Sequence, residues 1–123
     1  MSYLDGFLVP VPEGSKDQYR AMAEKMAGKL TEQGAVAVLE GWGDDLPRGK
    51  TTDFFMAVKA EDGENVVFSF VVWPSKTVRD AAWEKIMADP EMQPGAEPIP
   101  FDGKRMFWGG FDPIVEVKER VPA

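Results

Sequence analysis

Aromatic and charged side chains suited to binding gather at three points where a predicted loop meets a predicted strand. Tryptophans at strand ends can form the apolar wall of a small-molecule pocket. Basic side chains can hold a small anion, and the planar guanidinium of Arg105 suits a carboxylate. We therefore predict a small-molecule site at the mouth of a barrel-like fold. The candidate ligand-binding residues are Trp42, Lys50, Asp53, Trp73, Lys104, Arg105 and Trp108.

Each of these residues also has a purely structural interpretation. The charged ones can form ion pairs that anchor loops or join subunits, and Asp44, Asp45 and Asp53 can neutralise the basic cluster. The tryptophans can pack in a core or an interface. Gly109 and Gly110 indicate either a bend in the last strand or the close approach of another group, and we favour the bend.

The chain has no cysteine and no histidine. These absences exclude disulfides, thiolate metal sites, cysteine nucleophiles and imidazole bases. Any metal would need oxygen ligands, and the adjacent Asp44 and Asp45 point apart in an extended chain. We therefore expect no cofactor and no bound transition metal. In a cofactor-independent enzyme, the residues left for acid–base work are Asp53, Glu40, Lys104 and Tyr3.

Length and charge indicate one acidic domain. The 123 residues suit a single domain, and the formal net charge of −7 at pH 7 disfavours nucleic acid and anionic membrane surfaces as partners. The amino-terminal residues MSYLDGFLVPV lack a basic region, and no stretch approaches the ~20 apolar residues that cross a bilayer. We therefore expect a cytoplasmic protein.

Hydrophobic periodicity predicts the order strand, helix, strand, strand, helix, strand. The first helix begins at a capping pair, Ser15 and Gln18, and ends at Gly34; the second runs from a Ser75 cap to Ala88. The predicted strands are residues 3–11, 35–42, 66–73 and 105–117. This order predicts a ferredoxin-like α+β domain, an antiparallel sheet with both helices on one face.

Some local details are also predicted, and one stays open. Residues 53–59 can form either a strand or one short helix capped near Thr52. Gly103, in the FDGK turn, is expected to have a positive φ. Arg79 and Asp80 are expected to be solvated or paired. The second helix is expected to face inward with Val78, Ala81, Ala82 and Ile86.

Residues 66–73 (VVFSFVVW) form a strand that is apolar on both faces. Two helices can cover only one face of a four-stranded sheet, so something else must cover the other. A second copy of the sheet, packed face to face about a two-fold axis, would do so. The alternative is that the insert near residue 55 and the proline-rich loop at 91–103 fold across the open face. We favour the homodimer.

Three segments carry a family resemblance: WGDDLPRGKTTDF at 42–54, WPSKTVRDA at 73–81 and FDGKRMFWGGF at 101–111. With the opening YLDGF, they resemble the YbaA-like family of small bacterial proteins, whose function is unassigned. The resemblance implies a dimeric α+β barrel. That fold also serves cofactor-free monooxygenases, haem proteins and stress-related proteins, so it assigns no chemistry by itself.

Three functions are consistent with the sequence. The first is a homodimer that binds a small molecule in a pocket between the sheet and the helices. The second is a cofactor-independent enzyme, resembling a monooxygenase or an isomerase, that acts on a small aromatic or carbonyl compound. The third is a purely structural or partner-binding dimer. A carboxylate or lysine placed in a cleft would distinguish an enzyme from a simple binder.

Overall fold

The computed structural model describes residues 2–92 and 98–118, and it confirms the predicted α+β fold. Four antiparallel strands form one sheet in the order β2-β3-β1-β4. The strands are β1 (Tyr3–Pro12), β2 (Ala37–Trp42), β3 (Glu64–Trp73) and β4 (Phe107–Phe111). The α-helices are α1 (Lys16–Glu32), α2 (Phe54–Ala57) and α3 (Lys76–Met87), and short 3₁₀ helices lie at Glu13–Ser15 and Pro90–Met92.

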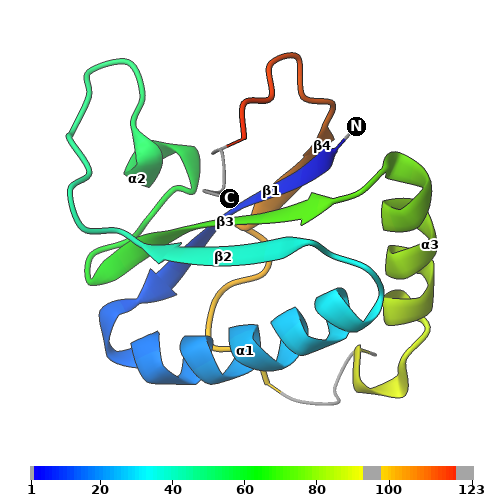
Figure 1. Cartoon of the computed structure of the whole chain (residues 1–123). Helices are drawn as coiled ribbons and strands as arrows, with labels where there is room; N and C mark the ends of the chain where they lie inside the picture. The colour runs from blue at the N-terminus through cyan, green and yellow to red at the C-terminus, as the bar shows by residue number, and fades with distance from the viewer. Residues whose placement is uncertain (1, 93–97, 119–123) are drawn as a thin grey trace, which may run out of the picture.

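The helices α1 and α3 lie on one side of the sheet, whereas α2 lies on the other (Figure 1). A capping residue begins α3 and another ends α1, whereas Ser15, the predicted cap of α1, makes no side-chain cap hydrogen bond. The Ser75 hydroxyl accepts a hydrogen bond from the Val78 N–H at 3.2 Å, which starts α3 as predicted. After α1, Gly34 takes a φ of 110°, a left-handed conformation that glycine adopts without strain.

Residues 53–59 form the short helix α2 rather than a strand. Its cap is Asp53, whose carboxylate accepts a hydrogen bond from the Met56 N–H at 2.7 Å. The predicted cap, Thr52, is one residue too early. The cap explains the helix, because a strand would leave this carboxylate without its backbone donor.

Several local predictions were wrong. The last strand spans only Phe107–Phe111 rather than residues 105–117, since Arg105 belongs to a turn and Pro113 has no N–H to continue the ladder. Gly103 does not have a positive φ. On α3, Ala81 is exposed and Trp83 packs inward in its place.

Two groups of buried side chains join the sheet to the helices. They share the helix-facing side of β1 and β3 and one stripe each of α1 and α3. The first group is Val9, Val11, Tyr19, Ala23 and Val67, and the second is Leu30, Val71, Trp73, Ala82 and Ile86. This core fixes α1 beside β2, and it therefore shapes the groove described below.

The opposite face of the sheet is apolar and exposed. The strand register places four large side chains there. Their exposed fractions are 51% for Leu39, 48% for Phe68, 47% for Phe107 and 59% for Phe111. These side chains form an exposed apolar patch on this face of the sheet.

The described parts of the two segments expected to cover this face leave these four side chains exposed, and residues 93–97 of the proline-rich loop lie outside the described residues. In the loop before β4, Phe101 packs against Tyr19 on the helix side, with ring centroids 5.9 Å apart. The insert reaches the open face only at one corner, where Phe54 meets Phe68 with ring centroids 6.4 Å apart. Within the described residues, no helix has the length and apolar character needed to cross a membrane.

Candidate ligand-binding groove

A groove of about 310 Å³ runs between α1 and the edge strand β2. Helix α1 contributes Lys16, Tyr19, Arg20, Ala23, Glu24 and Ala27 to it. From the sheet come Val38, Glu40, Gly41 and Trp42, with Val67 of β3 behind them. Alternation along β2 turns Val38, Glu40 and Trp42 toward the helix, so one strand supplies an apolar wall, a carboxylate and an aromatic ring.

Two hydroxyl groups hold the Glu40 carboxylate on the floor of the groove. Tyr19 donates its hydroxyl proton to Glu40 Oε1 at 2.7 Å, and Ser69 donates to Oε2 at 2.6 Å. Burial raises the pKa of Tyr19 well above its usual range, and the neighbouring Glu40 carboxylate raises it further. Tyr19 is therefore a permanent hydrogen-bond donor at physiological pH, and the carboxylate is fixed in orientation.

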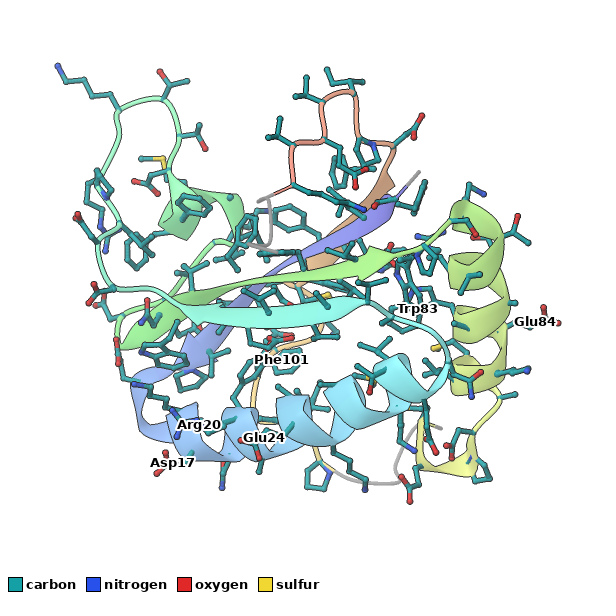
Figure 2. The ribbon with its side chains drawn as sticks, viewed as in Figure 1. Asp17, Arg20, Glu24, Trp83, Glu84 and Phe101 are labelled. Carbon is teal, nitrogen blue, oxygen red and sulfur yellow. The ribbon has the colours of Figure 1, made fainter. Side chains whose placement is uncertain are left out.

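The rim of the groove carries positive charge. The Lys16 ammonium lies 5.5 Å from the centroid of the Trp42 ring, a cation–π contact. Arg20 follows Lys16 by four residues and so lies on the same side of α1. Figure 2 labels Arg20 and Glu24 next to each other on this helix. The rim thus carries the exposed cations Lys16 and Arg20 together with the Glu24 carboxylate.

Trp42 is the one predicted ligand-binding residue that lines this groove in the described part of the chain. Lys50 is exposed in the loop before α2. Asp53 is engaged at the start of that helix, and the N–H groups of Gly49 and Met56 lower the pKa of its carboxyl. The structure does not place Lys50 or Asp53 at the groove.

Arg105 is occupied by acidic partners from another part of the chain. Its two terminal nitrogens donate to the Glu64 carboxylate at 2.6 and 2.8 Å, a bidentate pair. Its Nε donates to Asp102 at 2.9 Å, and it also donates to the Lys59 carbonyl at 3.0 Å. The guanidinium holds the pKa of Glu64 below its usual range. The neighbouring Lys104 side chain is exposed. This geometry matches the loop-anchoring alternative for Arg105.

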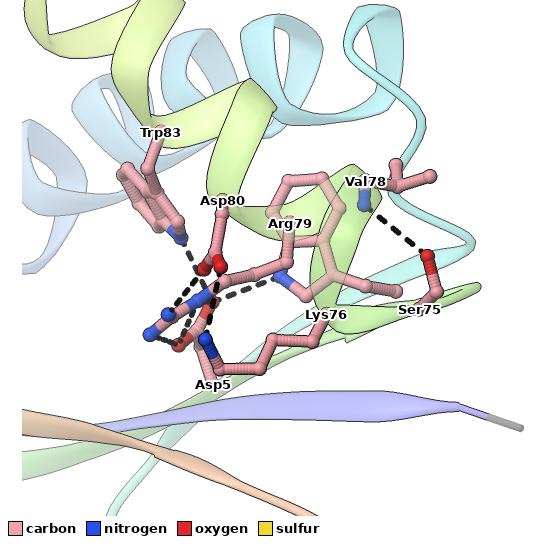
Figure 3. A network of polar contacts seen from close by, with 8 residues as sticks. Asp5, Ser75, Lys76, Val78, Arg79, Asp80 and Trp83 are labelled. Atoms are coloured by element: carbon pink, nitrogen blue, oxygen red, sulfur yellow. Dashed lines mark hydrogen bonds and ion pairs between the residues drawn. The ribbon is translucent and has the colours of Figure 1, made fainter.

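Trp73 belongs to a buried polar cluster that the sequence did not predict. Asp5 has a fully buried side chain whose Oδ2 accepts the indole N–H groups of Trp73 and Trp83, each at 2.8 Å (Figure 3). Arg79 donates to Asp5 through Nη2 at 2.6 Å and Nε at 3.1 Å. The pairing expected for Arg79 is therefore present, with Asp5 and with Asp80. The cluster fastens α3 to β1.

Trp108 lies on the edge strand β4 and is 59% exposed. The Arg79 guanidinium lies between its ring, at 5.8 Å, and that of Tyr3, at 5.2 Å. The β1–β4 register continues without a bulge through Gly109 and Gly110, so the expected bend is wrong. Close approach explains Gly110, because a Cβ there would collide with the Tyr3 hydroxyl and with Arg79.

The sequence contains signals for the three residues at the centre of the groove, but they lie in separate segments. Glu40 stands out as a charge between Val38 and Trp42 on the helix-facing side of a strand, and it was named as a possible acid–base residue. Tyr19 was visible only as part of the apolar stripe of α1, and Ser69 only as a polar break in β3. The strand register, which pairs Glu40 with Ser69, joins these signals.

The groove can bind a small molecule through an apolar wall, a fixed carboxylate and mobile cations. Among the described residues, no group of three or more acidic side chains is placed to hold a metal ion, and Asp44 and Asp45 are exposed. Glu40 is also the one named acid–base candidate that borders the groove within the described segments.

Comparison with known proteins places the chain among relatives without an assigned activity. It is 55% identical over 116 residues to "Uncharacterized protein YbaA" of Escherichia coli strain K12, covering 94% of this chain and 99% of that protein. The protein of the same description from Shigella flexneri matches equally well. Among solved structures, Rv0793 from Mycobacterium tuberculosis is similar with a TM-score of 0.49 and 14% identity, covering 96% of this chain and all of that one.

A family model described as "Protein of unknown function (DUF1428)" matches residues 2–103. This match covers most of the chain, including the groove and the Asp5 cluster, and it ends before β4. Together with the identity to the Escherichia coli protein, it shows that the chain belongs to the DUF1428 family.

Proposed function

We propose that this protein binds a small molecule in the groove between α1 and β2. The observation that carries the proposal is the Glu40 carboxylate. It lies in a partly apolar groove, oriented by the Tyr19 and Ser69 hydroxyls, and no lysine or arginine pairs with it in the described part of the chain. Glu40 is an exposed residue of an edge strand, and the two hydroxyls fix the orientation of its carboxylate at the groove. A few oriented polar groups in an apolar recess are typical of ligand sites.

Ligand-observed NMR screening of a library of small polar compounds tests this proposal. Trp42→Leu removes the aromatic wall of the groove, whereas Trp108→Leu removes an exposed tryptophan on the far edge strand. We expect compounds that bind the wild-type protein and the Trp108→Leu variant but lose their signal with Trp42→Leu. A library without hits, or hits that depend on Trp108 and not on Trp42, would overturn the proposal.

We further propose that two copies pair through the open face of the sheet. Leu39, Phe68, Phe107 and Phe111 lie there half-exposed, and fully burying a side chain of this kind contributes about 1.5–3 kcal/mol. Val115, 78% exposed, borders a hollow of about 600 Å³ beside the same face. A second copy supplies a matching apolar surface about a two-fold axis.

Sedimentation equilibrium tests the dimer. The wild-type protein should give close to twice its chain mass of 13.6 kDa. Phe68→Glu places a charge on the open face and should give the monomer mass. Ala21→Glu, which adds the same charge to the exposed side of α1, is the matched control and should stay dimeric. A wild-type monomer at every accessible concentration would refute the pairing.

One observation favours a cofactor-independent enzyme as the second candidate. Glu40 borders the groove and can accept a proton from a bound compound, while Tyr19 returns a hydrogen bond to the same carboxylate. Glu40→Gln keeps the shape and one acceptor oxygen, while its amide N–H can only donate to the other hydroxyl, and it removes the base. If binding compounds are converted, this variant should bind them without turnover; turnover equal to wild type would exclude Glu40 as the base.

A further inference from the structure

We infer that the groove selects a zwitterion with a small apolar body, the chemistry of a free α-amino acid. This inference rests on the proposed ligand-binding function and adds the chemical class of the ligand. It follows from charges of both signs that face the groove and are not paired with each other, together with the size and polarity of the wall between them.

The floor of the groove carries a negative charge without a cation. Both Glu40 oxygens accept hydrogen bonds from neutral hydroxyls, at 2.7 and 2.6 Å, and no ion pair to Glu40 exists among the residues that the structure describes. Each carboxylate oxygen still has a second acceptor position. An ammonium group presents three donors and a full positive charge, so it complements this floor better than a neutral donor.

The rim carries two cations, Lys16 and Arg20, next to the Glu24 carboxylate, which also lines the groove. Within residues 2–92 and 98–118, neither Lys16 nor Arg20 is in an ion pair, and the Lys16 ammonium lies over the Trp42 ring instead. Both side chains are exposed and stand one helical turn apart on α1, so they can close on a carboxylate from the same side. The guanidinium of Arg20 can hold both oxygens of that carboxylate.

The wall between floor and rim is apolar and the space is small. Val38, Val67, Ala23 and the Trp42 ring line it, and the volume of about 310 Å³ lies at the lower end of the ~300–1,000 Å³ that ligand pockets span. An aliphatic or aromatic amino acid fits this space.

The charge of the whole protein also favours a zwitterion over a simple anion. With a formal net charge of −7, the molecule repels anions as they approach. A zwitterion has no net charge and meets no such repulsion, yet it uses both signs of charge once it is bound. A simple cation would be attracted to the protein but would meet Lys16 and Arg20 at the rim.

Isothermal titration calorimetry with leucine and phenylalanine tests the inference. Two analogues each remove one charge: N-acetyl-leucine lacks the ammonium, and leucinamide lacks the carboxylate. We expect leucine, phenylalanine or both to bind. The N-acetyl and amide analogues of the amino acid that binds should bind about tenfold more weakly or worse, a difference of about 1.4 kcal/mol.

Variants assign each charge to its partner. In Glu40→Gln the preference for the free amino acid over its N-acetyl analogue should disappear, and in Arg20→Gln the preference over the amide should disappear. Glu84→Gln, on the exposed side of α3, is the matched control and should behave as wild type. Arg20 is exposed, so Arg20→Gln decides the carboxylate half even if the Glu40 variant folds poorly.

The results separate this inference from the proposed function. If the NMR screen finds Trp42-dependent ligands but neither amino acid binds, or an analogue binds as well as its parent, the zwitterion inference is overturned while the groove remains a ligand site. If the screen finds nothing and the amino acids do not bind, both are overturned.

Discussion

The groove depends, at the scale of single residues, on a tyrosine that keeps its proton. Tyr19 is 7% exposed and donates to Glu40. Folding raises the pKa of Tyr19, so the protonated side chain contributes fully to the free energy of unfolding below the unfolded pKa of about 10. This contribution declines as pH rises beyond that value. Alkaline titration followed by tyrosinate absorbance should show a component well above pH ~10 that Tyr19→Phe removes. A Tyr19 that titrates near its ordinary value would contradict the described hydrogen bond.

The Tyr19–Glu40 hydrogen bond should also contribute to stability. Tyr19→Phe leaves the ring in the core and removes only the donor, so the free energy of unfolding in urea should fall by about 1–3 kcal/mol. A double-mutant cycle with Glu40→Ala isolates the pair. A coupling energy near zero would show that the two side chains do not interact in solution.

Arg105 shows how a residue that resembles a binding site can instead anchor a loop. It joins the turn at Asp102 to Glu64 at the start of β3. Because Arg105 lowers the pKa of Glu64, the resulting stabilisation is present above pH ~4.3 and declines as pH falls through the folded pKa. Arg105→Ala should lower the melting temperature at neutral pH. On acidification, the melting temperature of this variant should then fall less than that of the wild-type protein. Lys104→Ala, the exposed neighbour, should change neither; equal effects of the two variants would contradict the anchoring role.

Helix α3 is held, at the scale of elements, by the buried Asp5 cluster. Asp5→Ala leaves the two indole donors and the Arg79 guanidinium without their acceptor, and it should cost about 3–5 kcal/mol of unfolding free energy. Asp80→Ala removes only the exposed partner of Arg79 and serves as the control, with a clearly smaller loss. Similar losses for the two variants would show that Asp5 is not the centre of the cluster.

The caps of the helices make a local prediction. Ser75→Ala removes the side-chain acceptor for the Val78 N–H and should lower the free energy of unfolding by about 0.5–2 kcal/mol. Thr77→Ala, on the exposed first turn of α3, should have little effect. Chemical denaturation of both variants measures the difference, and an effect of Thr77→Ala as large as that of Ser75→Ala would argue against the cap.

The order of the elements was predictable because its signals are local. Ser75, Gly34 and the alternation of residues 66–73 each act within a few positions, and the structure agrees with all of them. The partners of charged side chains were not predictable in the same way. Arg105 meets Glu64, 41 residues away, and Arg79 meets Asp5, 74 residues away, so only the folded register brings them together.

Trp42 and Trp73 show that strand order also limits what the sequence predicts for tryptophans. Its position at the end of a strand indicated a pocket wall, and it does line the groove. Trp73 had the same signal but lies fully buried beside Asp5, because β3 is a central strand and β2 an edge strand. Strand order within the sheet, which the sequence does not encode locally, separates the two tryptophans.

The proposed pairing of open faces has, at the scale of the whole molecule, a thermodynamic consequence. If folding and association are linked, the melting temperature should rise with protein concentration, since mass action favours the associated folded state. Phe68→Glu should abolish this dependence while Ala21→Glu retains it. A melting temperature independent of concentration in the wild-type protein would argue against a dimer stabilised through this face.

The ligand site between α1 and β2 is the central proposal for this protein, and crystallography tests it directly. The protein should be crystallised with a saturating amount of the tightest-binding compound from the NMR screen. We predict density for that compound between α1 and β2, in contact with Glu40 and Trp42. Density for the compound beside Arg105 or Trp108, with only solvent between α1 and β2, would contradict the proposed ligand site.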